Sequence, residues 1–176
     1  MIPAFTENWF GETSCEALAD LYGRTTGPGR VIEVGSWEGR STIALADACW
    51  PEILHAVDTW EGSPGEISAS LAATRDVYGR WHANVYGTTA GNVVPFRMGW
   101  REYADLVGAP IRFLFVDAEH TYEEVRDTID TFRGLMVPGG VICGDDVHHP
   151  PVRDAVLEAF GSKAMTIATL WYWQAP

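Results

Sequence analysis

The sequence predicts an α/β fold, in which helices cover both faces of a doubly wound and mainly parallel sheet. Short apolar segments that suit buried strands alternate along the chain with longer segments of helical periodicity. The first apolar segment, Val31–Val34, is followed by a turn with two glycines, Gly35–Gly39, and then by a helix. Strand, glycine turn and helix in this order form a ligand crevice at the carboxyl end of a strand.

Composition and charge limit the class of protein. The chain has 176 residues, of which 47% are apolar and 20% charged, as expected for one soluble domain. Its net charge of −12 argues against nucleic acid as a partner. There is no run of about 18 apolar residues that would indicate a membrane span, and no pattern of a secretory signal. Three cysteines without a C-x-x-C pair indicate reduced thiols and a cytoplasmic location.

We expect a single domain, in which residues 1–29 form one helix with a lead-in and residues 30–176 form the ligand-binding core. The T-x-x-E spacing of Thr13 and Glu16 predicts the start of the first helix. Pro95 marks the third strand as an edge strand, because proline cannot donate to a sheet. The expected strands are Val31–Val34, Ile53–Asp58, Val93–Arg97, Ile111–Asp117, Val141–Asp146 and two short strands within Ala164–Trp173.

The segments between these strands carry the expected helices. They are Ser41–Trp50, Ile67–Tyr86 with a break near Gly79, Arg101–Val107, one that starts at Thr121, and Val152–Phe160. A second T-x-x-E pattern, Thr121 to Glu124, predicts the start of the fourth of these. Pro138–Gly140 is expected to turn the chain into the fifth strand. The connection Thr59–Asn92 is long, and extra length beside a ligand crevice suits a lid or a substrate wall.

The glycine turn indicates the ligand class. A dinucleotide-binding turn reads G-x-G-x-x-G, whereas this turn is G-x-x-x-G with Trp37 in place of a central glycine. Glu33 lies in an otherwise apolar strand, where a buried acid needs partners. One interpretation is that Glu33 accepts hydrogen bonds from a cationic amino group of the ligand, directly or through water. Asp58 ends the second strand, where an acid binds ribose hydroxyls in nucleotide-binding sheets; a simple turn aspartate is the alternative.

The end of the third strand offers a wall for an adenine ring. Trp100 is suited to stack on such a ring, although a core or surface tryptophan is an equal alternative. The candidate cofactor-binding residues lie on the glycine turn and at the ends of neighbouring strands: Glu33, Gly35, Ser36, Trp37, Gly39, Ser41, Asp58, Thr59, Trp60, Gly99, Trp100 and Asp117.

Three aspartates end two strands that should be neighbours in the sheet. Asp117 ends the fourth strand, and Asp145 and Asp146 end the fifth. Like charges this close repel one another unless protons or a cation neutralise them. Mg²⁺ and Mn²⁺ prefer oxygen ligands, so the sequence predicts a metal site of these three aspartates. The alternative is that one aspartate bonds backbone amides while the others face solvent.

His120 is a candidate general base. It lies three residues after Asp117, close enough for a turn to bring its imidazole over the same crevice. The alternative is an ordinary residue at the start of a helix. His148 and His149 are further candidates for the site, and Glu66 and Glu119 are further candidate ligands.

Four segments together resemble the class I S-adenosylmethionine-dependent methyltransferases: EVGSWEGRST, VDTWEGS, FVDAEHTYEEV and PGGVICGDDV. Within that class they are similar to the metal-dependent sugar- and macrolide-type O-methyltransferases, which are related to sequences labelled cephalosporin hydroxylase. The resemblance runs from about residue 30 to the C-terminus. It implies a Rossmann-like, seven-stranded sheet of order 3-2-1-4-5-7-6 with the last strand antiparallel. It also implies S-adenosylmethionine as cofactor, Asp117, Asp145 and Asp146 as metal ligands, and His120 as the base beside Asp117.

The expected reaction is therefore methyl transfer from S-adenosylmethionine to a hydroxyl of a small molecule, assisted by Mg²⁺ or Mn²⁺. A sugar or glycoside hydroxyl beside a second oxygen fits best, and a vicinal diol also fits. The alternatives are a metal-independent small-molecule methyltransferase, a non-catalytic domain that binds the cofactor, and an NAD-dependent oxidoreductase. We expect no nucleic acid and no membrane as partner, and association with further copies of the chain stays open.

Overall fold

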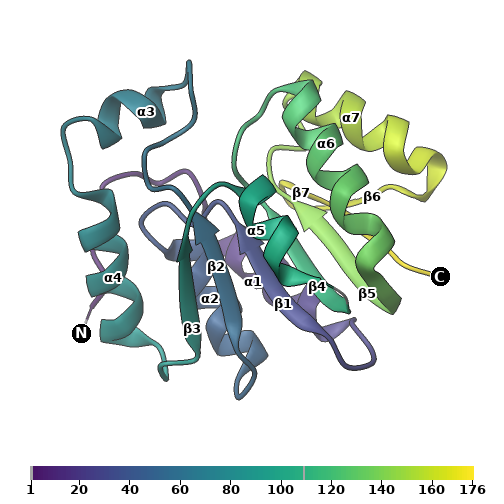
Figure 1. The fold of residues 1–176 in the computed structure, drawn as a ribbon, viewed down its shortest axis with the longest axis horizontal. Helices are drawn as coiled ribbons and strands as arrows, with labels where there is room; N and C mark the ends of the chain where they lie inside the picture. The colour runs from purple at the N-terminus through teal and green to yellow at the C-terminus, as the bar shows by residue number, and fades with distance from the viewer. Residues whose placement is uncertain (1, 109) are drawn as a thin grey trace.

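The computed structural model describes residues 2–108 and 110–176, and its centre is a seven-stranded sheet (Figure 1). The strand order is β3-β2-β1-β4-β5-β7-β6, which confirms the predicted topology. The pairs among β1 to β5 are parallel, and β7 runs antiparallel to both of its neighbours. The strands are β1 (Arg30–Val34), β2 (Leu54–Asp58), β3 (Val93–Arg97), β4 (Ile111–Val116), β5 (Met136–Gly144), β6 (Met165–Ile167) and β7 (Leu170–Gln174).

The described chain has seven α-helices, and six of them form two layers around the sheet. They are α1 (Glu12–Gly23), α2 (Arg40–Cys49), α3 (Ile67–Ala72), α4 (Val77–Thr88), α5 (Trp100–Val107), α6 (Tyr122–Phe132) and α7 (Pro150–Phe160). Figure 1 shows α5, α6 and α7 in front of the sheet, while α3 stands above the carboxyl ends of the strands. Two short 3₁₀ turns, η1 (Arg133–Leu135) and η2 (Gly161–Lys163), follow α6 and α7.

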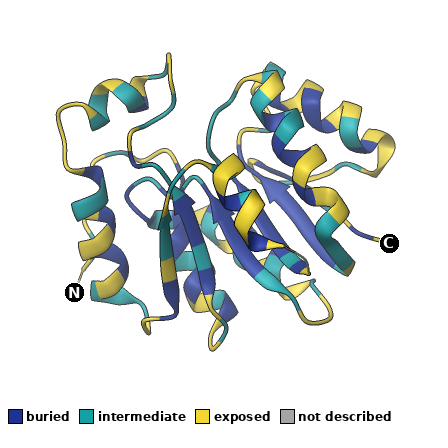
Figure 2. Ribbon diagram, viewed as in Figure 1, coloured by how far each residue is buried: buried dark blue, intermediate teal, exposed yellow. Residues whose placement is uncertain are grey.

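Side-chain alternation along each strand divides the core into two parts. In β1, Val31 packs with α1, α2 and α4 on one face, and Ile32 packs with α5, α6 and α7 on the other. The central strands are therefore buried over most of their length, as the blue ribbons of Figure 2 show, while the helices turn their yellow faces outward. Because helices cover both faces of the central strands, a ligand can reach them at their carboxyl ends.

Two of the predicted boundaries are wrong for local reasons. The first helix begins at Glu12 after Gly11, without a side-chain cap, so Thr13 does not start it. Strand β5 begins at Met136, because that residue pairs with Ile111 of β4, and the expected turn Pro138–Gly140 is part of the strand. The second T-x-x-E pattern is confirmed, since the Thr121 hydroxyl accepts a hydrogen bond from the Glu124 backbone at 3.3 Å.

The long connection after β2 forms two helices instead of one. The helix break falls between α3 and α4, where the Asp76 side chain accepts a hydrogen bond from the backbone N–H of Gly79 and so caps α4. Gly79 itself is helical and does not mark the break. The connection therefore places a short separate helix, α3, beside the carboxyl ends of the strands.

No helix among the described residues is long and apolar enough to cross a membrane. Cys15, Cys49 and Cys143 are free thiols in the structure.

Candidate active site

A cavity of about 460 Å³ opens at the carboxyl edge of the sheet, over the ends of β1, β2, β4 and β5. Helix α3 and the segment before α1 complete its wall. Most of the predicted site residues line it: Gly35, Ser36, Trp37, Ser41, Asp58, Thr59, Gly99, Trp100, Asp117, His120, Asp145 and Asp146. Glu33, Gly39 and Trp60 do not line it.

The glycine turn is held by the residues around it. Gly35 has φ +88°, and a Cβ there would lie 2.0 Å from the Asp117 carbonyl oxygen, so only glycine lets β1 and β4 end so close together. The Asp58 carboxylate accepts hydrogen bonds from the backbone N–H groups of Ser36 at 2.7 Å and Trp37 at 2.9 Å. Asp58 thus organises the turn in this structure, and its binding of ribose stays a prediction.

Trp37 carries a hydrogen-bond donor that no described residue satisfies. Its backbone is left-handed, with φ +44°, and its indole Nε1 is buried without a partner. The ring lies 5.3 Å from that of Trp9, measured between centroids. A buried N–H without an acceptor is costly, so this residue at the cavity suits a ligand that brings an acceptor such as a carboxylate. The amino-acid end of S-adenosylmethionine has one, so the residues present fit the predicted cofactor.

Glu33 lies behind the cavity wall and binds two residues that line the cavity. Its side chain is fully buried and accepts hydrogen bonds from the hydroxyls of Ser36 at 2.8 Å, Ser41 at 2.6 Å and Thr42 at 2.5 Å. Burial raises the pKa of Glu33 to about 7, although the three hydroxyl hydrogen bonds oppose this shift. Glu33 does not line the cavity, whereas Ser36 and Ser41, which donate to it, do, so its contact with a ligand group stays a prediction.

The buried Glu33 should make stability depend on pH. The pKa of Glu33 is about 7 in the folded protein against its ordinary value of 4.5, so the folded state binds the proton more tightly. The free energy of unfolding should therefore fall as pH rises from about 4.5 to 7. Glu33→Gln should remove about 3 kcal/mol of this fall, measured by denaturant unfolding of the ligand-free protein. The exposed Glu12→Gln is the control, and a pH-independent difference between Glu33→Gln and wild type would contradict the assignment.

Gly39 and Trp60 take part in packing and do not line the cavity, so their contact with the cofactor stays a prediction. Gly39 begins α2 with φ +91°, and a Cβ there would lie 2.7 Å from the Val85 side chain of α4. Trp60 is buried against Tyr78 and Trp81 of α4, and its indole N–H donates to the Trp37 carbonyl at 2.9 Å. Trp60 thus supports the glycine turn through its hydrogen bond to Trp37, and Gly39 lets the end of the turn pack against α4.

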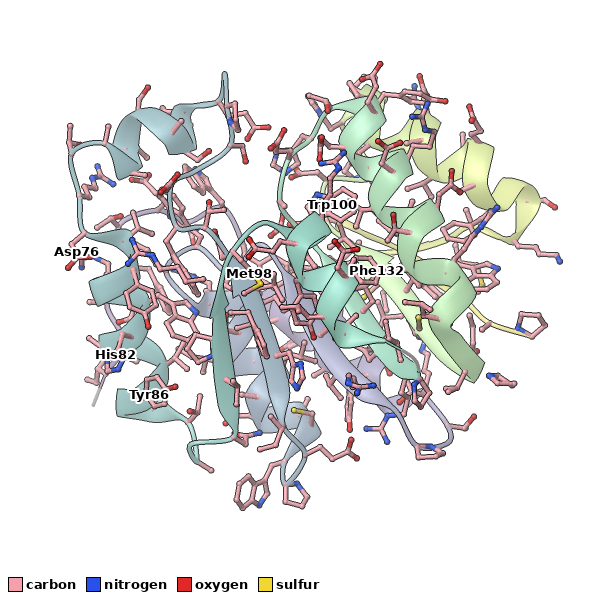
Figure 3. The ribbon with its side chains drawn as sticks, in the orientation of Figure 1. Asp76, His82, Tyr86, Met98, Trp100 and Phe132 are labelled. Carbon is pink, nitrogen blue, oxygen red and sulfur yellow. The ribbon has the colours of Figure 1, made fainter. Side chains whose placement is uncertain are left out.

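The end of β3 carries the predicted adenine wall. Met98, Gly99 and Trp100 line the cavity, and Figure 3 shows Met98 and Trp100 near each other at this end of the sheet. The Trp100 indole N–H donates to Glu124 at 3.1 Å, and the Arg101 guanidinium lies 4.1 Å from its ring centroid. The Trp100 ring is thus fixed before any ligand arrives, and its stacking on adenine stays a prediction.

Asp117, His120 and Asp146 form the tightest cluster of potential metal ligands among the described residues. One ligand atom from each lies within 4.8 Å of the others. The His120 Nε2 is 2.9 Å from Asp146 and 3.7 Å from Asp117, an ion-pair arrangement without hydrogen-bond alignment. Burial lowers the pKa of His120, but the carboxylates of Asp117 and Asp146 outweigh it and raise the pKa to about 11. The imidazolium here supplies the positive charge that these acids need.

Asp145, the third predicted metal ligand, lines the same cavity but lies outside this cluster of three. Its binding of a metal stays a prediction. Asp145 is only 8% exposed, and its Oδ1 has no hydrogen-bond partner among the described residues. Burial and the nearby Asp117 charge raise the pKa of Asp145 to about 6. Together with Asp117 and Asp146, this unpaired carboxylate oxygen forms a set of oxygen ligands that a hard divalent cation fits.

The segment before α1 forms part of the cavity wall, which the sequence does not predict. Phe5, Glu7, Trp9 and Phe10 line the cavity. The segment is tied to the glycine turn because the Thr6 backbone N–H and hydroxyl each donate to the buried Glu38 carboxylate at 2.6 Å. Residues 2–10 have neither helical nor strand periodicity, so the sequence gives no signal for their role. His148 and His149, in contrast, do not line the cavity.

Comparisons with known proteins agree with this arrangement. The profile of a family described as "Methyltransferase domain" matches residues 32–147. The solved O-methyltransferase NovP is 21% identical with a TM-score of 0.69, and the alignment covers 94% of this chain and 80% of NovP. CalS11, a calicheamicin methyltransferase, is 15% identical with a TM-score of 0.70 over 94% and 80% of the two chains. An O-methyltransferase from Bacillus cereus, solved with S-adenosylhomocysteine (SAH), is 19% identical with a TM-score of 0.61 over 94% and 82%. No curated protein sequence matches the chain.

The family profile spans more than half of the chain and includes the glycine turn, Asp58 and the acids that end β4 and β5. The solved structures share the seven-stranded sheet at identities that establish the fold alone. The chain therefore belongs to the methyltransferase-domain family and is an S-adenosylmethionine-dependent methyltransferase of class I fold.

Proposed function

We propose that this methyltransferase acts on a hydroxyl oxygen of a small molecule and uses a divalent metal ion, Mg²⁺ or Mn²⁺. One observation carries the proposal: the acids that end β4 and β5 converge with His120 on the cavity that the glycine turn lines. A hydroxyl is a poor nucleophile near neutral pH, so a site that methylates oxygen needs help to remove its proton.

Each residue of the cluster has a proposed part. Asp117 and Asp146 would hold the cation, and the unpaired Oδ1 of Asp145 offers a further ligand. A divalent cation would supply Lewis-acid chemistry there, lowering the pKa of a hydroxyl and neutralising the carboxylates that keep His120 protonated. His120 would take the proton of the acceptor hydroxyl at Nε2. The cavity walls orient the acceptor, since methyl transfer requires the oxygen in line with the methyl carbon and the sulfur.

The proposed acceptor is a sugar or glycoside hydroxyl with a neighbouring oxygen, or a vicinal diol. Two adjacent oxygens can chelate a cation, which a single hydroxyl cannot. The aromatic pair of Trp9 and Trp37, which lines the same cavity as the acids, suits the apolar face of a ring. A second structure of CalS11, the apo form, is described as a TDP-rhamnose 3'-O-methyltransferase. It is 16% identical to this chain, with a TM-score of 0.59.

The cofactor-binding part is tested at Asp58. Asp58→Ala removes the acceptor for the backbone N–H groups of Ser36 and Trp37, and it also removes the proposed ribose contact. We expect the affinity for SAH to fall by about 1–3 kcal/mol, measured by titration calorimetry. Failure of the unmutated protein to bind SAH, with or without Mg²⁺, would contradict the assignment of the cavity.

A further inference from the structure

We propose that Glu66 is a positioning residue for His120, so that the two form an acid–histidine pair across the cavity. This inference rests on the proposed function, in which His120 accepts the proton of the acceptor. Glu66 belongs to the connection after β2, 54 residues away from His120 in the sequence. It stands immediately before α3, and both residues line the cavity.

The contact between the two residues is made at three points. The Glu66 Oε1 accepts a hydrogen bond from the His120 backbone N–H at 3.1 Å. The imidazole Nδ1 lies 3.0 Å from Oε1 and 3.1 Å from Oε2 of the same carboxylate. One side chain thus fixes both the backbone and the ring of His120, whereas an isolated surface ion pair fixes neither.

The chemistry of the carboxylate determines which nitrogen carries the proton. An ionised carboxylate only accepts hydrogen bonds, so the Nδ1 that faces Glu66 carries a proton whether or not Nε2 does. Nε2 then points to Asp117 and Asp146, the side where the acceptor oxygen would lie. Such an arrangement sets the tautomer and the ring orientation, and it stabilises the imidazolium that forms when Nε2 takes a proton.

The position of Glu66 is itself well supported. Its backbone N–H donates to the Ser63 carbonyl at 3.0 Å, and the Ser63 hydroxyl donates to the Ala118 carbonyl at 3.3 Å. The Ser63 backbone N–H in turn donates to the Ser68 hydroxyl of α3 at 2.9 Å. The connection after β2 is therefore tied to the loop after β4, which carries His120. Glu66 is placed by these contacts independently of any ligand.

The pairing makes a specific kinetic prediction. Glu66→Ala should lower kcat about 10–100-fold, with KM for S-adenosylmethionine changed less than about threefold. Glu66→Gln keeps an acceptor oxygen, so its kcat should lie between those of Glu66→Ala and wild type. In a His120→Ala background, Glu66→Ala should cost nothing further, because the group it positions is gone. Glu61→Ala, an exposed acid in the same connection, is the matched control and should leave kcat unchanged.

A spectroscopic readout tests the pairing without turnover. Nitrogen-15 spectra of the protein loaded with Mg²⁺ and SAH should show a protonated, hydrogen-bonded Nδ1 for His120, assigned by loss of the signals in His120→Ala. In Glu66→Ala this hydrogen bond is lost, so the Nδ1 proton should exchange with water faster. Thermal melts of each variant show whether the fold is kept.

Different experimental results would contradict the Glu66–His120 pairing and the proposed function. Losses that multiply in the double variant, or a proton on Nε2 with a bare Nδ1 in the wild type, would overturn the pairing while the methyltransferase itself stays active. No methyl transfer by the wild type to any sugar, glycoside or diol would contradict the proposed function, and the pairing with it.

Discussion

Replacement of His120 with alanine should lower kcat by about 10²–10⁴-fold, the range for loss of a general base. The physical reason is its position, since Nε2 faces Asp117 and Asp146 at the cavity while Nδ1 is held from the other side. Methyl transfer from S-adenosylmethionine to a sugar or diol acceptor, under conditions in which chemistry limits turnover, measures the effect. The affinity for SAH and the melting temperature should change little.

The control for this variant is His149→Ala. The His149 ring centroid lies 6.0 Å from that of His120, yet His149 does not line the cavity. His149→Ala should therefore lower kcat only slightly. If His120→Ala keeps more than about a tenth of the wild-type kcat, His120 does not act as the base. His149 or metal activation without a side-chain base would then be the better explanation.

Removal of divalent metal should abolish turnover. A chelator should bring methyl transfer to background, and Mg²⁺ or Mn²⁺ should restore it. Asp146→Asn should raise the metal concentration needed for half-maximal activity, because Asp146 belongs to the tightest ligand cluster in the described chain. Asp145→Asn should have the same effect if the unpaired Oδ1 also reaches the ion. Calorimetric titration with Mg²⁺ measures the binding separately from activity.

The affinity for SAH is the internal control for both aspartate variants, because neither residue holds the glycine turn. Full activity in excess chelator would show that the acids are structural, and a metal-independent small-molecule methyltransferase would replace the present proposal. A weaker affinity of Asp146→Asn for SAH, without a change in the metal requirement, would place Asp146 on the cofactor instead.

Much of the fold follows from local patterns in the sequence. The apolar runs, the edge position of Pro95 and the strand-terminal acids predict the order of elements and the edge at which ligands bind. These features depend on side-chain alternation and backbone chemistry, which act over a few residues. The same patterns bring Gly35, Asp58, Asp117, Asp145 and Asp146 to one cavity, and the structure confirms that they line it.

Other features depend on contacts between distant segments, which no local pattern records. Gly39 and Trp60 lie in the predicted cofactor-binding segments, but in the structure both pack against α4 and neither lines the cavity. Asp145 and Asp146 are adjacent in sequence, yet only Asp146, with φ +59°, joins Asp117 and His120. The folded chain also brings residues 2–10 and Glu66 to the site, through hydrogen bonds to Glu38 and His120. Residue type and spacing therefore predict the edge where chemistry occurs, whereas packing between elements selects the side chains that face it.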